Sequence, residues 1–251
     1  MEKVMLIAGC SHTAGSEIDG NEDSKYNRQR SFGGQLAEKM GYRRVNVAQN
    51  GATNSGIARS VLQWCDKFYD PDNMKLFVLI GWTESTRIEA PSNNAFWYEG
   101  SSHSTDWFDE TGKHFHRINL GYEGGNAEEK EMYPYFHRFI ASNNTLMEIL
   151  SANYVLQMQY FLRSIEADYV MCNSMHMFTL PNTHLEFYTD LIDKSHYIDW
   201  NNNDQAFFWK YKNLGFVNEK AKYWHHGEIP HKMYSEDLYD FIERNKCLSP
   251  D

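Results

Sequence analysis

The chain has 251 residues, a formal net charge of -10 at pH 7, 41% hydrophobic residues and 15% aromatic residues. Disordered chains are poor in aromatic residues, so this composition predicts a folded protein with a sizeable core. The negative charge excludes a general nucleic-acid-binding protein, because neutralising phosphates requires clustered Lys and Arg and the sequence has no basic run.

The start of the chain and its cysteines bear on location and cofactors. The apolar stretch in MEKVMLIAGC is shorter than the roughly 7–15 residues of a signal peptide's apolar region. No stretch approaches the ~20 apolar residues of a membrane span. The four cysteines include no CxxC pair, and neither GxxxxGK[ST] nor GxGxxG occurs after the first apolar run. We therefore expect a cytoplasmic protein (host cytoplasm if viral), without secretion signal, membrane span, metal or cofactor.

The first third of the chain alternates between apolar runs and amphipathic segments. The runs at 3–9, 44–49 and 75–82 predict buried strands. Helices are predicted at 31–40, with Ser31 as N-cap and Gly41 past the end, and at 54–68, with Asn54 or Ser55 as cap; 16–30 is predicted as a loop. This β-α-β-α-β order predicts an α/β protein with a parallel sheet covered by helices on both faces.

The remainder of the chain has two long irregular segments, at about 83–143 and 175–224. Between them lie a predicted helix at 144–166 and a fourth strand at 168–173, and the second segment has a helix near 183–193. An amphipathic helix at 231–245 closes the chain. Its expected buried face comprises Tyr234, Leu238, Phe241 and Ile242. No repeat or linker marks a second domain, so we expect a single domain over 1–251 with two insertions.

Polar segments follow the first three predicted strands: GCSH, QNGATNS and GWTEST. In parallel sheets, functional groups gather at the carboxyl ends of the strands. Ser11 directly follows the first strand, where it can supply a nucleophilic hydroxyl and an N–H for an oxyanion, or can merely cap a turn. A serine nucleophile needs a base, and the histidine-rich segment 225–231 precedes the last helix; the alternative is a surface loop with solvated imidazoles.

These segments resemble, in order, the blocks of SGNH (GDSL-type) hydrolases. GCSHT resembles the first block, GDSx with the nucleophilic Ser, with Cys10 in place of Asp. NVAQNGAT, at 46–53, resembles the second block, which makes Gly51 an oxyanion-hole donor. GWTE stands where the third block, GxND, is expected, with Thr83 in place of Asn. The resemblance implies a three-layer α/β/α, flavodoxin-like SGNH hydrolase fold with an oxyanion hole formed by Ser11, Gly51 and Thr83.

The last SGNH block, DxxH, is altered in this chain. Alignment through the closing helix places the catalytic base at His225, but Lys222 then occupies the acid position and cannot orient an imidazole. Alternatively, Glu228 and His231 fit an acid-x-x-His pattern. We favour His225, with His226 and His231 as rivals; the acid stays unassigned, and a Ser–His dyad using a backbone carbonyl is an alternative.

Two charged residues after the third strand are candidate substrate contacts. Arg87 can bind an anionic or sugar group at the mouth of the site, and Glu84 is a second candidate. We favour a structural ion pair between Arg87 and Glu84 or Glu89. For the aromatic residues of the first insertion we favour a small hydrophobic core over sugar stacking; they are Trp97, Tyr98, Trp107 and Tyr122.

The resemblance predicts a serine hydrolase of the esterase or deacetylase type, acting on an ester of a glycan or lipid. The altered third and last blocks favour an alternative, a catalytically degraded protein with a structural, glycan-binding or host-factor-binding role. A second alternative is an acyltransferase that uses the same residues. The forms GCSHT and IGWTE are similar to SGNH-like proteins of tailed bacteriophages, which makes a virion component one expected setting.

Overall fold

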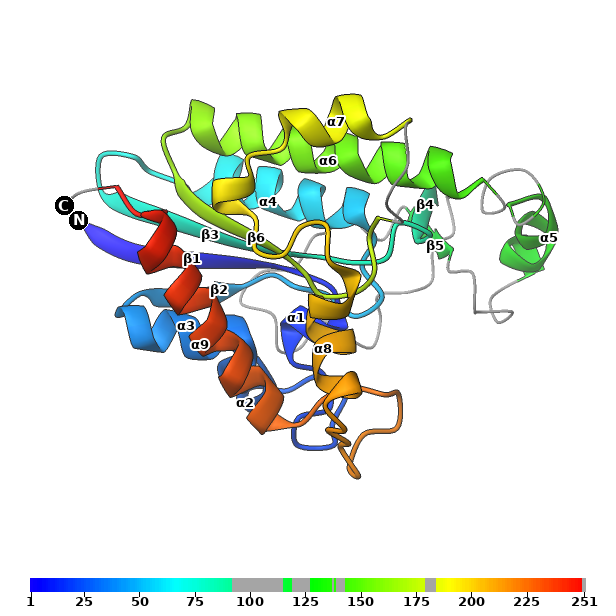
Figure 1. The fold of residues 1–251 in the computed structure, drawn as a ribbon, viewed down its shortest axis with the longest axis horizontal. Helices are drawn as coiled ribbons and strands as arrows, with labels where there is room; N and C mark the ends of the chain where they lie inside the picture. Colours follow the sequence, from blue (N-terminus) through cyan, green and yellow to red (C-terminus); the bar gives the residue numbers. More distant parts are fainter. Residues whose placement is uncertain (92–114, 119–126, 137, 139–142, 179–183, 250–251) are drawn as a thin grey trace.

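The structure, a computed structural model, describes residues 1–91, 115–118, 127–136, 138, 143–178 and 184–249. Its centre is a parallel sheet in the order β2-β1-β3-β6 (Figure 1). The strands are β1 (Glu2–Gly9), β2 (Arg43–Asn46), β3 (Met74–Trp82) and β6 (Asp168–Asn173). Counted within the sheet, the order is 2-1-3-4, as in flavodoxin-like sheets. The predicted α/β class with a central parallel sheet is confirmed.

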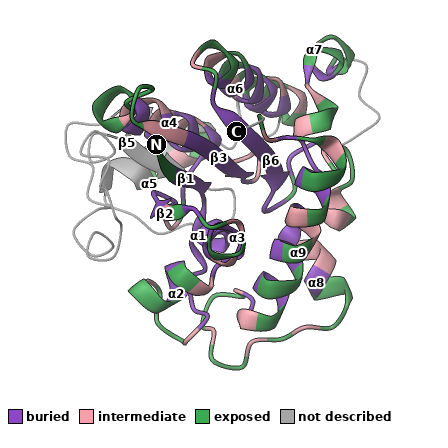
Figure 2. Cartoon of the chain, turned by 90° about the vertical axis from the view of Figure 1, so that its left-hand side faces the viewer, coloured by how far each residue is buried: buried purple, intermediate pink, exposed green. Residues whose placement is uncertain are grey.

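Helices cover both faces of this sheet, as Figures 1 and 2 show. One face carries α4 (Asn54–Phe68) and α6 (Asn144–Ser164), and the other carries α3 (Phe32–Met40) and α9 (Glu228–Asn245). Alternate side chains of β1 enter different cores: Leu6 packs with the α4 and α6 side, and Met5 and Ile7 with the α3 and α9 side. Burial on both faces explains why this strand is a continuous apolar run.

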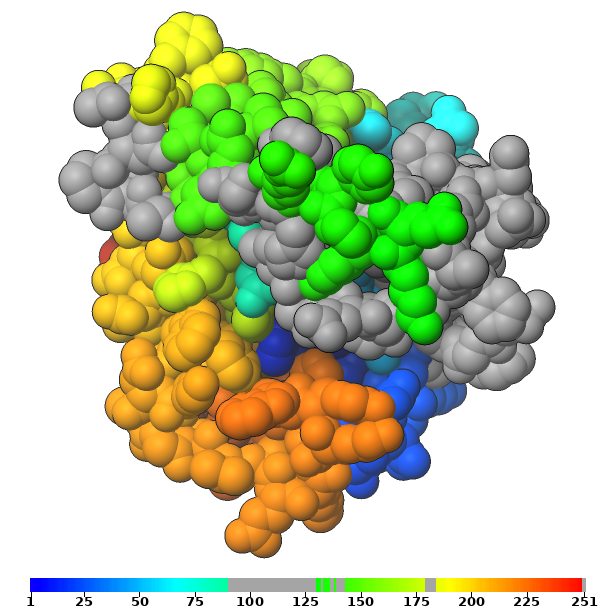
Figure 3. Space-filling view, turned by 90° about the vertical axis from the view of Figure 1, so that its right-hand side faces the viewer, coloured from blue at the N-terminus to red at the C-terminus, as the bar shows by residue number. Residues whose placement is uncertain are grey.

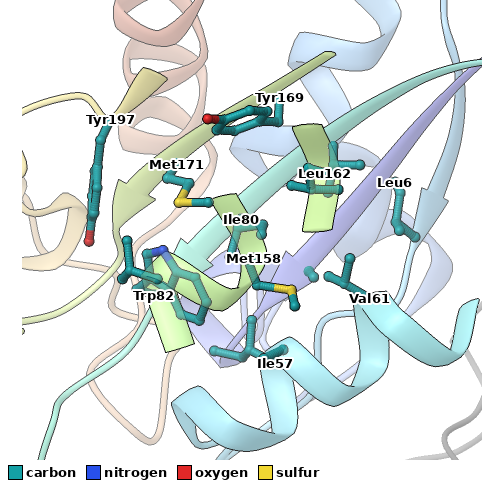
Figure 4. Packing of buried hydrophobic residues seen from close by; sticks show 14 of the residues in the cluster. Leu6, Ile57, Val61, Ile80, Trp82, Met158, Leu162, Tyr169, Met171 and Tyr197 are labelled. Carbon is teal, nitrogen blue, oxygen red and sulfur yellow. The ribbon is translucent and has the colours of Figure 1, made fainter. Parts of the chain in front are cut away.

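Figure 4 shows the larger core, between the sheet and helices α4 and α6. Trp82, at the end of β3, is fully buried there. The labelled residues facing one another from the helices and the sheet include Ile57, Val61, Ile80, Trp82, Met158 and Leu162. Each buried aliphatic side chain of this kind contributes about 1.5–3 kcal/mol to folding. This packing fixes β3, whose carboxyl end borders the candidate site.

The predicted helix boundaries are mostly confirmed. The Ser31 hydroxyl caps α3, and Gly41 ends the helix at φ 72°. Helix α4 has the predicted bounds, but its cap is the Thr53 side chain rather than Asn54 or Ser55. Asn54 instead bonds to the backbone after β3. All four predicted core residues of α9 are buried. Helix α9 begins at Glu228, earlier than predicted, because Pro230 in its first turn needs no hydrogen-bond acceptor.

Four segments differ from the sequence-based prediction. The predicted loop 16–30 contains α2 (Lys25–Arg30), capped by Ser24. Strand β2 ends at Asn46, three residues before the predicted end. The first insertion contains the antiparallel pair β4 (Ile88–Pro91) and β5 (Phe115–Ile118), and α5 (Ala127–Phe136); its four predicted core aromatics lie outside the described residues. The second insertion contains the helix α7 (Glu186–Leu191) and the short 3-10 helices η3 (Lys194–His196) and η4 (Asn203–Gln205). It also contains α8 (Phe207–Asn213), which was not predicted.

None of the helices in the described part of the chain combines the length and the apolar character that crossing a membrane requires.

Candidate active site

Ser11 begins the short helix α1 (Ser11–Ala14) directly after β1. Gly9 and Gly81 are paired across β1 and β3, and a Cβ atom at either would lie within 2.2 Å of the Thr13 Oγ1 atom. The absence of both side chains therefore lets α1 pack onto the strand ends. The Thr13 Oγ1 atom also lies 2.7 Å from the Ser174 Oγ atom, after β6. These contacts hold Ser11 at the carboxyl edge of the sheet, where the sequence predicted it.

Figure 3 looks onto this carboxyl edge. The dark blue atoms of the first residues after β1 lie at the bottom of a hollow, with the orange segment near residue 224 below them. Ser11 is 8% exposed, and its Oγ atom forms no hydrogen bond with a described residue. The hydroxyl is therefore not committed to the turn-capping role that was the alternative interpretation.

His225 lies beside α1 although it is more than 200 residues away in sequence. The centroids of the His12 and His225 rings are 4.7 Å apart, so the base candidate is next to the residue that follows Ser11. The His225 Nδ1 atom lies 2.6 Å from the Glu17 Oε2 atom. A carboxylate can only accept, so Nδ1 is the donor, and the neutral ring keeps its lone pair on Nε2. This is the tautomer that a general base requires.

Glu17 is the carboxylate bonded to His225, and so the candidate for the acid position that sequence reasoning left unassigned. Its carboxylate accepts hydrogen bonds from the backbone N–H groups of Lys222, at 2.8 Å, and Tyr223, at 2.9 Å, and its side chain is 1% exposed. Its backbone has φ 63°, a conformation that costs a non-glycine residue energy and that occurs often at functional sites. Lys222 thus contributes an N–H at the position where the DxxH block has its acid. Spacing alone did not distinguish Glu17 from the neighbouring Asp19, Glu22 and Asp23.

The pKa values of this pair favour a charged acid and a neutral base. Burial raises the pKa of Glu17, but the hydrogen bonds from His225, Tyr223 and Lys222 outweigh burial, and the net pKa lies below its ordinary value. Burial lowers the pKa of His225; Glu17 opposes this effect, the Arg87 charge adds to it, and the net pKa is below its ordinary value. At neutral pH, His225 is therefore an uncharged imidazole beside an ionised carboxylate.

His12 is a second buried imidazole in the site. It is 6% exposed, and its Nδ1 atom has no hydrogen-bond partner among the described residues. Its pKa is well below the ordinary value, first because of burial and then because of charge repulsion from protonated His225 and from Arg87. A protonated His12 would leave an uncompensated charge next to Ser11, so this ring stays neutral and packs as an aromatic group.

The rival histidines are held in structural contacts. The His226 Nε2 atom lies 2.9 Å from the Phe208 carbonyl oxygen, which makes Nε2 a donor, and the residue is buried. The His231 Nδ1 atom accepts the Phe32 N–H at 3.1 Å, so its lone pair is occupied.

Glu228 was the proposed partner of His231, but it contacts other residues. Its carboxylate accepts the Tyr26 hydroxyl at 2.7 Å and lies 3.4 Å from the Arg30 Nε atom. No hydrogen bond or ion pair joins Glu228 to His231, because Glu228 begins α9 at the surface whereas the His231 side chain is buried under it. The expected acid–base pair of these two residues is therefore not formed.

Gly51 lies in the loop between β2 and α4, at φ 68°, and is exposed. Its N–H donates no hydrogen bond to a described residue. The neighbouring Asn50 Oδ1 atom accepts the Ser16 hydroxyl at 2.5 Å, which joins this loop to the segment after α1. The predicted role of Gly51 as an oxyanion donor stays a prediction, with an N–H that is available for it.

Thr83, the third expected oxyanion donor, is fully buried. The Asn54 side chain holds its backbone on both sides, accepting the Thr83 N–H at 2.9 Å and donating to the Thr83 carbonyl at 3.2 Å. The Thr83 Oγ1 atom is inaccessible to solvent and has no hydrogen-bond partner among the described residues. The Asn54 side chain thus holds the Thr83 backbone, and the predicted role of Thr83 as an oxyanion donor stays a prediction.

The Arg87 Nε atom lies 3.2 Å from the Glu84 Oε2 atom, an ion pair of the kind that was favoured for these residues. Glu89 instead binds Arg59, with 2.6 Å between Oε2 and Nη1. The Arg87 charge contributes to the lowered pKa of both His12 and His225. A direct contact of Arg87 or Glu84 with substrate stays a prediction.

Within the described residues, no group of three or more His, Cys, Asp or Glu side chains is arranged to bind a metal ion.

No protein-family model and no curated protein sequence matches the chain. A psychrotrophic esterase from Pseudoalteromonas has a similar structure, with 11% sequence identity and a TM-score of 0.45; the match covers 97% of this chain and 98% of the esterase. A G-D-S-L family lipolytic protein from Veillonella parvula is also similar, with 12% identity and a TM-score of 0.45; the match covers 97% of this chain and 100% of that protein. An acetyl xylan esterase has 10% identity and a TM-score of 0.44, and the match covers 96% of this chain and 99% of the esterase. Identities and TM-scores this low assign no function to the chain.

Proposed function

We propose that this chain is a serine ester hydrolase in which Ser11 is the nucleophile, His225 the general base and Glu17 the residue that orients the base. The observation that carries the proposal is the 2.6 Å contact between His225 Nδ1 and Glu17 Oε2, on a histidine that lies against the α1 helix begun by Ser11. A buried carboxylate, an imidazole and an uncommitted serine hydroxyl are the components of a nucleophilic triad.

The reaction follows from these groups. His225 Nε2 takes the proton of Ser11 while Oγ attacks the ester carbonyl, which becomes a tetrahedral oxyanion. The N–H groups of Ser11 and Gly51 are the proposed donors to this oxyanion. The intermediate collapses to an acyl-serine, and the alcohol leaves with the proton from His225. Water, deprotonated by His225, then attacks the acyl-serine, releases the carboxylic acid and returns the proton to Ser11.

Labelling with a fluorophosphonate probe tests this proposal. The probe phosphonylates activated serines, so wild-type protein is expected to be labelled and to hydrolyse p-nitrophenyl acetate. Ser11→Ala is expected to abolish both. Ser164→Ala, which changes an exposed serine of α6, is the matched control and is expected to behave as wild type. Lack of labelling of folded wild type, or labelling that survives in Ser11→Ala, contradicts the proposal.

The burial of Thr83 favours one further candidate function, a non-catalytic protein with the same architecture. Removing one oxyanion donor costs about 10²–10³ in rate, and the Thr83 hydroxyl is closed off here. This candidate predicts no probe labelling in a folded protein. An acyltransferase would instead be labelled at Ser11, and would be recognised by transfer of the acyl group to an added polyol rather than to water.

A further inference from the structure

Gly51 lies in a tight turn that follows β2. The Ala52 N–H donates to the Gln49 carbonyl oxygen at 3.1 Å, which makes Gly51 the third residue of a four-residue turn. Gly51 has φ 68°, whereas Asn50 before it does not have a positive φ, and this combination is typical of a type II turn with glycine in the third position. The turn uses the N–H of Ala52 and not that of Gly51, so the Gly51 N–H can donate to a ligand.

Both ends of this turn are fixed by the fold, whereas its tip is exposed. The Gln49 N–H donates to the Gly9 carbonyl oxygen of β1 at 2.9 Å, and Ala52 at the other end is buried. Gly51, at the tip, is exposed and forms no hydrogen bond with a described residue. The position of the tip therefore depends on the side chain of Asn50, the residue that shares a peptide bond with the Gly51 N–H.

The Asn50 side chain is held at both of its polar atoms. Its Oδ1 atom accepts the Ser16 hydroxyl at 2.5 Å, and its Nδ2 atom donates to the Glu22 carbonyl oxygen at 3.3 Å. Both partners lie in the segment between α1 and α2. An amide offers an acceptor and a donor on one planar group, so Asn50 binds both partners at once. These two bonds tie the tip of the turn to the segment that follows α1.

Ser16 connects Asn50 to the proposed nucleophile. The Ser16 N–H donates to the Ser11 carbonyl oxygen at 3.0 Å, while its hydroxyl donates to Asn50 Oδ1. Ser16 is 2% exposed, so water hardly competes for these bonds. It also directly precedes Glu17, the proposed acid. Two hydrogen bonds thus lead from Ser11 to the residue before Gly51, and the segment that makes them carries the acid.

We propose that Ser16 and Asn50 are positioning residues that hold the Gly51 N–H at the oxyanion; this inference rests on the proposed ester hydrolysis at Ser11. The oxyanion forms on the carbonyl carbon that is bound to Ser11 Oγ, so its donor must keep a fixed distance from Ser11. A displacement of about 1 Å in such a group lowers the rate about 10²-fold. The chain of bonds from Ser11 through Ser16 to Asn50 sets this distance for an exposed turn.

The bond between Ser16 and Asn50 is not needed to close the turn. The bond between Gln49 and Ala52 closes it, and Asn50 is only partly buried, so water can replace the Ser16 hydroxyl at Oδ1. Loss of this bond is therefore expected to cost little stability. A positioning role then appears as a loss of rate without a matching loss of unfolding free energy.

Kinetics of Ser16→Ala and Asn50→Ala on p-nitrophenyl acetate test the proposal in the whole chain. Each variant is expected to lower kcat and kcat/KM by the same factor, about tenfold, and to leave KM unchanged, because the oxyanion exists only in the transition state. The double variant is expected to lose no more than Asn50→Ala alone, because both residues act through one bond. Asn73→Ala is the matched control. Asn73 binds Asp70 in an exposed turn before β3, at the opposite edge of the sheet, and its variant is expected to keep the wild-type kcat.

A trifluoromethyl ketone measures the oxyanion directly. Ser11 Oγ adds to the carbonyl carbon of 1,1,1-trifluoro-2-butanone, the Ser11 proton passes to His225, and the carbonyl oxygen becomes the oxyanion of a hemiketal. The inhibition constants for Ser16→Ala and Asn50→Ala are expected to rise about tenfold, in step with the loss of kcat/KM. Urea denaturation of the same variants is expected to give midpoints close to that of wild type.

The outcomes separate this inference from the proposed function. If wild type hydrolyses the ester and both variants keep its kcat, raise KM alone or leave ketone inhibition unchanged, the positioning role is wrong and ester hydrolysis stands. Should Asn50→Ala fail to fold, Ser16→Ala decides, because it removes a single hydroxyl. If wild type is labelled by the fluorophosphonate probe without turnover, the labelling rates of the variants decide in the same way. A folded wild type that neither hydrolyses the ester nor is labelled overturns both, since no oxyanion then forms at Ser11.

Discussion

Glu17 and His225 are the residues on which the proposed chemistry depends most. Glu17 receives one imidazole donor and two backbone donors, and these donors all come from the segment that precedes α9. The carboxylate therefore both fixes the segment and selects the His225 tautomer. A Ser–His dyad oriented by a backbone carbonyl, one of the alternatives from sequence, is not needed to orient this ring.

Glu17→Gln tests the role of the charge with little change in shape. The variant is expected to lower kcat on p-nitrophenyl acetate about 10²–10⁴-fold, because the imidazolium that forms during attack loses its counter-charge and the tautomer is no longer fixed. Glu17 raises the pKa of His225, so its loss is expected to move the acid limb of the kcat/KM profile to lower pH.

A structural role for Glu17 alone would lower activity without moving the acid limb. Glu228→Gln is the matched control, since Glu228 binds Tyr26 and Arg30 instead of a site histidine. It is expected to keep the wild-type profile. A large loss of kcat in Glu228→Gln would return the acid role to Glu228.

Among the secondary-structure elements, the junction of β1 with α1 positions Ser11, the proposed nucleophile. The pair Gly9 and Gly81 leaves space that Thr13 fills, and Thr13 in turn reaches Ser174 after β6. Three strand ends are thereby joined under one short helix. The helix itself is only four residues long, so its position depends on these contacts and not on its own helical propensity.

Gly81→Ala tests this junction. The new Cβ would lie 2.2 Å from Thr13 Oγ1 and 2.5 Å from Ser174 Oγ, so α1 must move. The variant is expected to lose about 1–3 kcal/mol of unfolding free energy in urea denaturation, and to react more slowly with the fluorophosphonate probe. Gly227→Ala meets no heavy atom closer than 3.7 Å and is expected to lose less stability. Equal stability and reactivity of Gly81→Ala and wild type would refute the proposed packing.

At the scale of the whole molecule, the two faces of the sheet have different roles. The larger core lies on the face covered by α4 and α6. The other face is covered by α3 and α9, and the segment that contains His225 directly precedes α9. Buried histidines accumulate on this second side: His231 packs between Phe32 and Phe207 under the start of α9. The site and this half of the fold are thus expected to lose stability together on acidification.

Stability is expected to fall as pH drops below about 6.5, the ordinary pKa of histidine. Burial, the largest cause, lowers the pKa of His12 and of His231 well below that value, so below pH 6.5 the unfolded chain binds protons that the folded chain does not. Urea denaturation at pH 7.5 and 5.5 measures the difference. The variant His231→Gln lacks this titrating group. Its free energy of unfolding is expected to fall less between pH 7.5 and pH 5.5 than that of wild type. A wild-type stability that is equal at both pH values would contradict this account.

Sequence patterns alone predicted the order of the four sheet strands and of helices α3, α4, α6 and α9, the position of Ser11 after β1, and the buried face of α9. These features are local: apolar periodicity, capping residues and strand ends lie within one turn or one strand of the residues they govern. Helix α2 escaped prediction because its segment is polar, and its packing depends on Arg28, whose guanidinium bonds to the Ala48 carbonyl at 2.9 Å after β2.

The contacts between residues far apart in the chain could not be predicted from sequence patterns. Glu17 and His225 are 208 residues apart, Asn54 and Thr83 are 29 apart, and both pairs form because strand ends and their loops converge at one edge of the sheet. The spacing of residues along the chain does not predict such contacts. The two cores align the strands and thereby stabilise these contacts, so the contact between Glu17 and His225 and the burial of Thr83 follow from packing over the whole fold.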